Sequence, residues 1–239
     1  MVSSKKREEL VGALHSDDPA AALRHLESQG ALFSIIPELQ TAKGAEQPPE
    51  HFWDVLNHLE ESVSSVDAVL ADPILLSSKF PLSSYFREKP CGSLSRLTIL
   101  KIAALFHDIA KPQTLTREPD GQYRFFGHPE LGASIAKEAM LRLGFFACEI
   151  SMVSTMIVHH LRPGVLAYKE VPSDRALLRY FRDLNDVAVD TLILSLADHR
   201  SMRGPLMGKE EWIEHLEAVK SVLDRQVERL NRQKMQLNF

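Results

Sequence analysis

A single apolar helix that ends in an ionisable pair constrains the fold of this chain most. Residues 96–109 carry Leu, Ile and Ala on almost every side, which predicts a central helix that is buried around most of its circumference. His107 and Asp108 lie at the end of this helix, so an imidazole and a carboxylate are expected side by side in the interior. Burial of such a pair is unfavourable unless a partner compensates for lost hydration, and a divalent cation is the usual partner.

Helical periodicity also dominates the rest of the chain. It predicts further helices over residues 50–70, 129–143, 149–160, 173–183, 187–200 and 209–232. Pro119, Asp120 and Gly121 lie between two β-prone stretches and predict a small hairpin within residues 114–126. Residues 71–95 contain three prolines and many serines, so a long loop is expected there. The predicted fold class is all-α, a helical bundle with a small β-hairpin.

A short helical appendage is expected before the main domain. Asp18 followed by Pro19 is typical of a helix start, and Gly30 is typical of a helix end. The polar segment 43–49, which contains Gly44, is typical of a linker. The final helix is heavily charged and is interpreted as a solvated face or a partner helix. The expected units are a neck-like appendage over residues 1–45, the main domain over 50–205 and the charged helix over 206–239.

Composition narrows the classes of function. The net charge is −4, so no general basic field predicts nucleic-acid binding, and any RNA contact must be local. The two cysteines, Cys91 and Cys148, lie far apart and outside any CxxC pattern, so neither a disulfide framework nor a thiolate zinc site is expected. The first residues lack the apolar run of a signal peptide, and no stretch approaches a membrane span. We therefore expect a cytoplasmic protein without membrane contact.

Residues that could bind a divalent cation recur on or next to the predicted helices. In chain order they are Asp54, His58, His107, Asp108, His128, His159, His160 and Asp198. Imidazole and carboxylate ligands together favour first-row transition metals, and a carboxylate can bridge two ions. This set of residues is large enough for two ions.

The order His58, His107-Asp108, Asp198, with Lys111 three residues after the pair, resembles the H…HD…D signature of the HD-domain metal-dependent phosphohydrolases. The phrases LFHDIAKP, FFGHPELGASIA, VHHLRPG and LADHRS are especially similar to the HD domain of bacterial CCA-adding tRNA nucleotidyltransferases and related poly(A) polymerases. Upstream, ALRHLESQGALFSIIPEL looks like the neck region of that family. The nucleotidyltransferase head of that family has no counterpart in this sequence.

The resemblance implies a role for each candidate ligand. A first metal would be bound by His58, His107, Asp108 and Asp198. A second metal would be bound by His128 and the pair His159-His160, with Asp108 as a bridge between the two ions. Either site is compatible with Mn, Fe, Ni, Co, Mg or Zn, so the expected cofactor is one or two divalent ions.

The resemblance also implies an activity, the hydrolysis of a phosphoester of a nucleotide or an RNA end, such as a 2',3'-cyclic phosphodiester or a phosphomonoester. Asp108 and Lys111 are the expected catalytic residues, and Lys111 and Arg162 are expected near the substrate phosphate. Lys111 could instead be an ordinary helix C-terminal charge. The alternative function is a non-catalytic module that binds RNA or a partner, and a second copy of the chain is a further candidate partner.

Several candidate ligands have a structural interpretation as well. Asp54 could cap its own helix. His51 lies seven residues before His58, and we expect it to be a solvent-facing residue in the first turn of that helix. Only one of His159 and His160 needs to be a ligand, because successive helical residues point about 100° apart.

Overall fold

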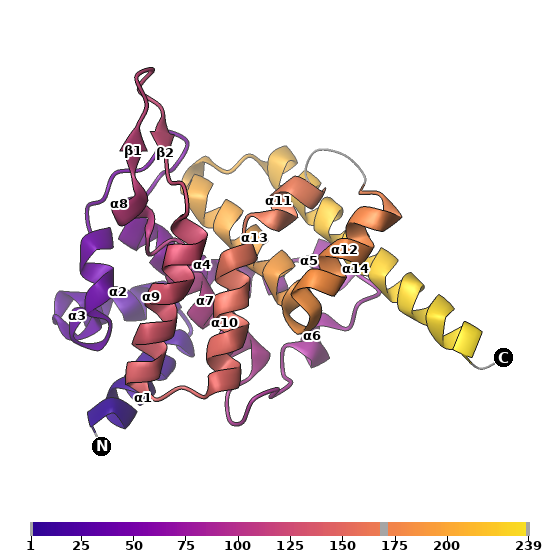
Figure 1. Cartoon of the computed structure of the whole chain (residues 1–239), viewed down its shortest axis with the longest axis horizontal. Coiled ribbons are helices and arrows are strands. Elements are labelled where there is room, and N and C mark those ends of the chain that lie inside the picture. Colours follow the sequence, from indigo (N-terminus) through magenta and orange to yellow (C-terminus); the bar gives the residue numbers. More distant parts are fainter. Residues whose placement is uncertain (1, 168–171, 238–239) are drawn as a thin grey trace.

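The computed structural model describes residues 2–167 and 172–237, and these ranges are almost entirely helical (Figure 1). Within them, strand pairing is confined to one two-stranded sheet, so the predicted all-α class with a small hairpin is confirmed. The same ranges hold no helix that combines the length and the apolar character needed to cross a bilayer.

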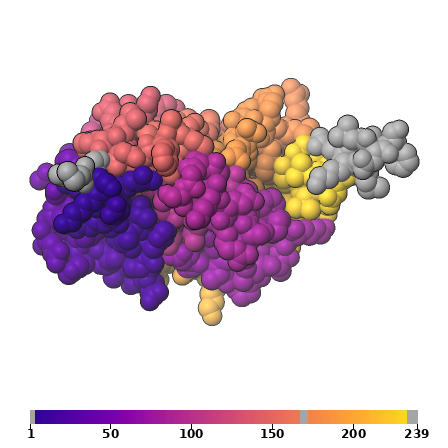
Figure 2. Space-filling model, turned by 90° about the horizontal axis from the view of Figure 1, so that it is seen from below, coloured from indigo at the N-terminus to yellow at the C-terminus, as the bar shows by residue number. Residues whose placement is uncertain are grey.

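Four short elements open the chain. They are α1 (Val2–Leu14), α2 (Pro19–Ser28), α3 (Ala31–Ile35) and the 3₁₀ turn η1 (Pro37–Ala42). Asp18 caps α2 as predicted, because its side chain accepts a hydrogen bond from the backbone N–H of Ala21 at 3.0 Å. Leu10 and Leu23 belong to the same apolar core as the rest of the chain. Figure 2 shows these helices, in indigo, packed directly against the following segments.

Three helices form the centre of the fold. They are α4 (Val55–Leu70), α7 (Arg96–Phe106) and α13 (Ala188–Arg203), which contact one another pairwise. Apart from Leu97, every residue of α7 is buried, as its apolar circumference predicts. On the outer side of this centre, α9 (His128–Leu143) and α10 (Ala147–His159) pack against each other and against α7.

Two boundaries differ from the prediction. The helix expected from residue 50 begins at Val55, because the Asp54 side chain caps it by accepting from Asn57 N–H at 2.8 Å. The expected loop over residues 71–95 contains α5 (Pro73–Leu76) and α6 (Leu82–Tyr85). Leu75 and Leu82 of these helices are buried, so a tertiary contact stabilises turns that are too short to show a periodic pattern.

The hairpin lies between two elements of the central region. The helix α7 gives way to a turn and then to α8 (Lys111–Thr114), after which β1 (Thr116–Arg117) pairs antiparallel with β2 (Tyr123–Arg124). The turn between the strands contains Gly121 at φ 84°, a left-handed conformation that glycine adopts readily. The chain then enters α9 at His128, so the hairpin connects the His-Asp pair to the next predicted ligand.

The C-terminal elements cover one end of the bundle. They are α11 (Arg162–Ala167), α12 (Asp174–Leu184), η2 (Asn185–Val187), η3 (Gly204–Leu206) and α14 (Lys209–Leu237). The prediction placed a break at Pro163, but α11 forms there, because proline is tolerated in the first turn of a helix. The first half of α14 packs on the body through residues such as Leu216 and Leu223, and its second half extends outward (Figure 1).

Cys91 and Cys148 form a disulfide whose Cα atoms lie 5.7 Å apart. The expectation of no disulfide was therefore wrong. The fold brings the loop before α7 against the first turn of α10, a proximity that no local sequence motif reveals. The 57-residue separation encloses the His107-Asp108 pair, and closure of a loop of this length stabilises a fold by about 4 kcal/mol in the chain-entropy description.

Candidate metal centre

Six ionisable side chains converge between the central helices and the ends of α9 and α10. They are His58, His107, Asp108, His128, His160 and Asp198, and they form two groups that share Asp108. Within each group, the candidate ligand atoms lie within 4.8 Å of one another. All of these residues are buried except Asp198, which is partly exposed.

The first group consists of two histidines and two carboxylates. The Nε2 atoms of His58 and His107 lie 3.1 Å apart, and each lies 3.3 Å from Oδ2 of Asp108. Asp198 directs Oδ1 to the same point, 3.3 Å from His58 Nε2 and 3.4 Å from His107 Nε2. Four ligand atoms from α4, the turn after α7, and α13 therefore surround one position.

The second group uses the other oxygen of Asp108. Oδ1 lies 3.2 Å from His128 Nε2 and 3.6 Å from His160 Nε2, and these two nitrogens are 3.4 Å apart. Asp108 thus directs one carboxylate oxygen into each group. This is the arrangement in which a carboxylate can bridge two ions.

Local backbone geometry orients three of the histidines. His107, His128 and His160 each place Nδ1 within 2.7–2.9 Å of the carbonyl oxygen three residues earlier in the chain. A carbonyl can only accept, so Nδ1 carries the proton in each ring and the lone pair of a neutral ring lies on Nε2. Metal-binding histidines usually show this pattern, in which the second nitrogen donates to a fixed acceptor.

Two buried serines orient the remaining histidine. The Nδ1 atom of His58 lies 3.1 Å from Oγ of Ser201, and Ser201 Oγ donates to the carbonyl oxygen of Asp198 at 2.9 Å. Ser62 Oγ donates to the carbonyl oxygen of His58 at 2.8 Å and lies 2.6 Å from Ser201 Oγ. Because Ser201 gives its proton to the carbonyl, it accepts from His58 Nδ1, and the His58 Nε2 lone pair faces the centre.

These residues fit a divalent cation. In the second group, Oδ1 of Asp108 is buried and receives no hydrogen bond from any described residue, while the Nε2 atoms of His128 and His160 also present lone pairs. Burial lowers the pKa of His160 to about 4, so this ring brings no second proton near pH 7. Tetrahedral ligands at about 2.0–2.2 Å from an ion lie roughly 3.3–3.6 Å from one another, and the observed spacings are similar.

The first group also favours a bound positive charge. Burial lowers the pKa of His107, but the carboxylates of Asp108 and Asp198 outweigh it and raise that pKa to about 10. Burial raises the pKa of Asp108, but the positive charges of Lys111 and His107 hold it well below its usual range. The pKa of Asp198 is lowered for the same reason, with His107 as the main source of positive charge. Both carboxylates are therefore ionised, and a cation is favoured between them.

Lys111 lies at the edge of the centre together with two residues that the sequence analysis did not assign to it. Its Nζ lies 2.6 Å from Asp108 Oδ2, donates to Gln47 Oε1 at 2.9 Å and lies 3.4 Å from His51 Nε2. Burial and the Lys111 charge lower the pKa of His51 to about 3. The prediction of a solvent-facing His51 was therefore wrong. Gln47 and His51 belong to the connection between η1 and α4, and only tertiary packing brings this connection to the site.

Three other candidates lie apart from both groups. His159 is only partly buried, and its neighbour His160 takes the position at the centre. Asp54 caps α4, and its second oxygen accepts from the backbone N–H of Gly44 at 2.8 Å, which supports the capping interpretation. Arg162, which lies two residues after His160 in the chain, forms an ion pair with Asp183 at 3.1 Å.

The chain is similar to an established domain family and to two kinds of known enzyme. Residues 82–203, about half of the chain, match the HD domain family. The chain is 28% identical over 225 residues to the A-adding tRNA nucleotidyltransferase of Deinococcus radiodurans, a match that covers 92% of this chain and 45% of that protein. It is 31% identical over 208 residues to the CC-adding tRNA nucleotidyltransferase of Thermus thermophilus, covering 86% of this chain and 41% of that protein.

A second kind of relative is more distant. The bifunctional uridylyltransferase/uridylyl-removing enzyme of Azospirillum brasilense is 27% identical over 199 residues, which is 82% of this chain and 19% of that protein. The chain thus spans less than half the length of the nucleotidyltransferases and about a fifth of this enzyme.

Proposed function

The chain belongs to the HD domain family, and from this membership we propose that it is a metal-dependent phosphohydrolase acting on a phosphoester of a nucleotide or an RNA end. The observation that carries the proposal is the shared carboxylate of Asp108, with one oxygen in each of two histidine groups. Paired ions held in this way are a common device for hydrolysis at phosphorus.

Each group would hold one ion. His58, His107, Asp108 and Asp198 are the proposed ligands of the first, and Asp108, His128 and His160 are those of the second. When bound, such ions supply Lewis acidity and lower the pKa of a water molecule toward about 7. Asp108 is proposed to be catalytic in the sense that it fixes both ligand groups relative to each other.

Lys111 is the proposed phosphate contact. Its ammonium group is held at the edge of the centre by Asp108 and Gln47, and it lies 5.4 Å from the centre of the Phe125 ring. An anionic phosphoryl oxygen can replace the neutral Gln47 amide as acceptor, because a charged acceptor forms the stronger hydrogen bond. Lys111 would then offset charge that builds up on the phosphoryl oxygens.

The relatives support a nucleotide-based substrate. Two of them are named for addition of nucleotides to tRNA, and another is named in part for removal of a uridylyl group, which is attached through a phosphoester. RNA ends and nucleotidyl groups share the phosphoester that the proposed centre would hydrolyse. These classes of substrate therefore come first in an activity screen.

The adjacent histidines provide a matched test. We expect the purified protein to carry two equivalents of a transition metal, measured by elemental mass spectrometry, and to hydrolyse 2',3'-cyclic AMP or a nucleoside monophosphate. His160→Ala should reduce the metal content to one equivalent and suppress hydrolysis, whereas His159→Ala should change neither. Equal effects of the two substitutions, or no metal after supplementation with Mn, Fe, Ni and Zn, would contradict the proposal.

A further inference from the structure

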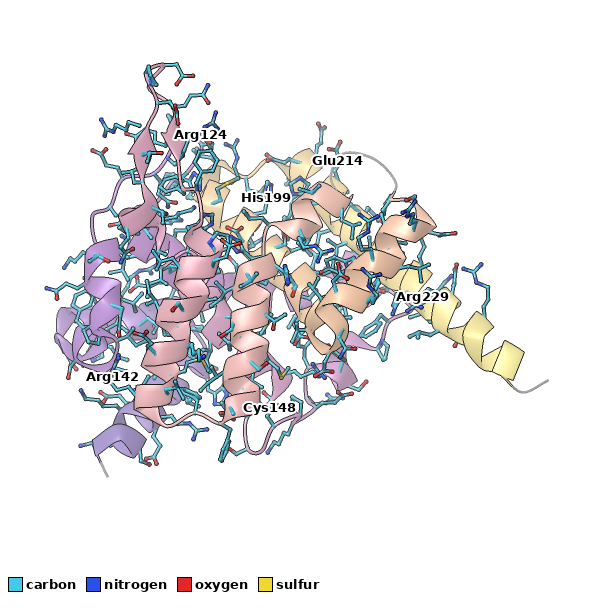
Figure 3. All side chains as sticks on the ribbon, viewed as in Figure 1. Arg124, Arg142, Cys148, His199, Glu214 and Arg229 are labelled. Atoms are coloured by element: carbon cyan, nitrogen blue, oxygen red, sulfur yellow. A yellow bond between two sulfur atoms is a disulfide. The ribbon has the colours of Figure 1, made fainter. Side chains whose placement is uncertain are left out.

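An open groove with a basic lining runs between α12 and the second half of α14. It encloses about 640 Å³ and is lined by residues that include Arg175, Arg179, Arg182, Arg229, Leu178 and Leu230. Figure 3 labels Arg229 where α14 passes α12. The groove is separate from the candidate metal centre, since it shares no lining residue with either ligand group.

The lining of this groove differs in charge from the rest of the chain. The whole sequence has a net charge of −4, yet the described residues lining the groove include four arginines and no carboxylate. A smaller hollow of about 240 Å³ continues from it, shares Arg229 and adds Arg225 and Arg232. Of the described residues lining it, one is a carboxylate, Asp174, which lies 2.7 Å from Arg225.

The same residue spacing produces both arginine rows. Arg175, Arg179 and Arg182 lie at positions i, i+4 and i+7 of α12, and Arg225, Arg229 and Arg232 repeat this spacing on α14. Residues at these spacings share one face of a helix, and like charges at this separation destabilise the helix. Asp183 pairs with Arg182 and Asp174 pairs with Arg225, so a bound anion is favoured mainly where Arg175 and Arg179 line the groove.

The interior sides of the same helices fix the position of the rows. On α12, Leu177, Tyr180, Phe181 and Leu184 are buried against the body, so the arginines are directed outward. On α14, Leu223 is buried, and Arg225 donates to the carbonyl oxygen of Pro172 at 2.6 Å, which anchors α14 beside the start of α12. The two rows are thus held by packing.

We propose that this groove binds single-stranded RNA through its phosphodiester backbone. Among the described residues, six arginines and no lysine line the two hollows. The guanidinium group is suited to phosphate because its planar donors bind two oxygens at once. Leu178 and Leu230, both exposed, add apolar surface between the charged rows for contact with bases or ribose. An extended polyanion can follow such a row, and a compact anion uses only part of it.

Two ion pairs join the groove to the start of α11. Asp183 lies 2.7 Å from Arg182, which lines the groove, and 3.1 Å from Arg162, which follows His160 by two residues. The inference rests on the proposed function only for the hydrolysis of the end of the bound RNA. Binding in the groove does not require the metal.

The test is fluorescence anisotropy with a short labelled single-stranded RNA of mixed sequence, in the presence of a chelator. Arg175→Glu/Arg179→Glu reverses two charges in the groove, and Arg87→Glu/Lys89→Glu makes the same change in net charge on the loop before α7. We expect the groove variant to weaken binding at least tenfold and the control variant to retain wild-type affinity. The slope of log K against log salt should fall by roughly 1.4 in magnitude in the groove variant, since each phosphate contact contributes about 0.7.

Several outcomes would overturn the inference. Unchanged binding by the groove variant, or an equal loss in the control variant, would show that the groove does not hold RNA. Displacement of the RNA by polyglutamate at equal charge would overturn the assignment of RNA as the occupant. Thermal melting followed by circular dichroism checks that all variants are folded.

The same experiment separates this inference from the proposed function. If the groove variant loses RNA affinity but the wild-type protein hydrolyses no phosphoester with any added metal, the groove inference is supported and the proposed function fails. If the groove variant still hydrolyses a mononucleotide and the wild-type protein does not bind RNA, the proposed function is supported and the groove inference fails.

Discussion

The helix pair α7 and α13 carries a buried charged cluster at each of its two ends, and the clusters differ in how their charge is balanced. At the first end, Arg96 lies 2.6 Å from Asp186 and 3.3 Å from Asp190, and Tyr85 donates to Asp190 at 2.5 Å. At the other end lie the residues of the metal centre, with His107 after the last turn of α7 and Asp198 on α13.

The chain supplies a cation at both ends, Arg96 at the first and Lys111 at the metal centre, but the two cations match the carboxylates differently. The guanidinium group of Arg96 is buried with the carboxylate of Asp190 and also pairs with Asp186, which is exposed. Among the described residues, no candidate ligand group involves these three side chains. At the metal centre, Lys111 reaches only Oδ2 of Asp108, while Oδ1 meets the lone pairs of two imidazoles. Buried charge alone therefore does not indicate a functional site. The informative feature is the second ligand group, where Oδ1 of Asp108 and two imidazole nitrogens converge as acceptors.

The largest effect is expected from removing the shared ligand and its neighbour. His107→Ala/Asp108→Ala deletes ligands of both groups, so bound metal should be lost and hydrolysis should fall by about a thousandfold or more, since metal ions supply several kcal/mol of transition-state stabilisation. Elemental mass spectrometry and a 2',3'-cyclic AMP assay measure the two quantities. If metal is retained at wild-type stoichiometry, the contrast between the two clusters disappears.

Removal of the cation at the first end should affect stability instead. Arg96→Met leaves Asp190 buried without its partner, and we expect the free energy of unfolding to fall by about 3–5 kcal/mol. Urea denaturation measures this change, and the metal content of the folded variant should equal that of the wild type. Arg96→Met/Asp190→Leu is the control, because it removes both charges and should recover part of the loss. Loss of metal in Arg96→Met would show that the two clusters are coupled.

The first cluster should also give stability a distinct dependence on pH. Burial raises the pKa of Asp190 to about 6, against the lowering effects of the Tyr85 hydrogen bond and the Arg96 charge. The folded protein then holds this proton more tightly than the unfolded chain, whose carboxyl pKa is about 3.8, so stability falls as pH rises from about 4 to about 6. The expected change is at most about 3 kcal/mol.

Asp190→Asn is expected to remove this component. Urea midpoints for the variant and the wild type across the same pH interval isolate the contribution of Asp190 from that of other groups. A wild-type protein that gains stability relative to the variant as pH rises would mean that the carboxyl pKa is lowered by Arg96, contrary to the expectation.

The smallest effect is expected from the serine that orients His58. Ser201→Ala removes the acceptor of the His58 Nδ1 proton, and metal affinity should fall about 10- to 100-fold, as is usual when a ligand loses such a partner. Competition with a chromogenic chelator measures the affinity. Ser65→Ala, which changes another buried serine of this region, is the matched control, and an equal loss in that variant would assign the effect to general packing.

Periodicity and capping signals in the sequence were sufficient for the main helices but not for the short ones. The burial of α7 and the start of α2 follow from local patterns that extend over several turns or place Asp18 before Pro19. The helices α5 and α6 have four residues each, so they contain too little periodicity to be detected. The Cys91–Cys148 disulfide is likewise a long-range contact with no local signal.

The residues that the family resemblance assigned to the site could be predicted from the sequence. The residues whose position depends on tertiary packing could not. The structure brings together six of the residues that the resemblance assigned to metal, and their role as ligands stays a prediction. The choice of His160 over His159 depends on the rotational phase of α10. Gln47 and His51 reach Lys111 from the connection between η1 and α4, whose path is set by tertiary contacts. The final helix was recognised from the sequence only as heavily charged, and the shared groove of the α12 and α14 arginines becomes evident only when the helices lie together.

The length of α7 has a consequence for how this protein can change during evolution. Arg96 and His107 lie at opposite ends of the helix, separated by about three turns, and so share nearly the same face. Insertion or deletion of one residue between them would rotate one charged cluster by about 100° relative to the other. Substitutions along this helix can accumulate one at a time. A change in its length would instead misplace an ion pair or a set of ligands in a single step. Insertions and deletions between residues 96 and 107 should therefore be rare among functional relatives.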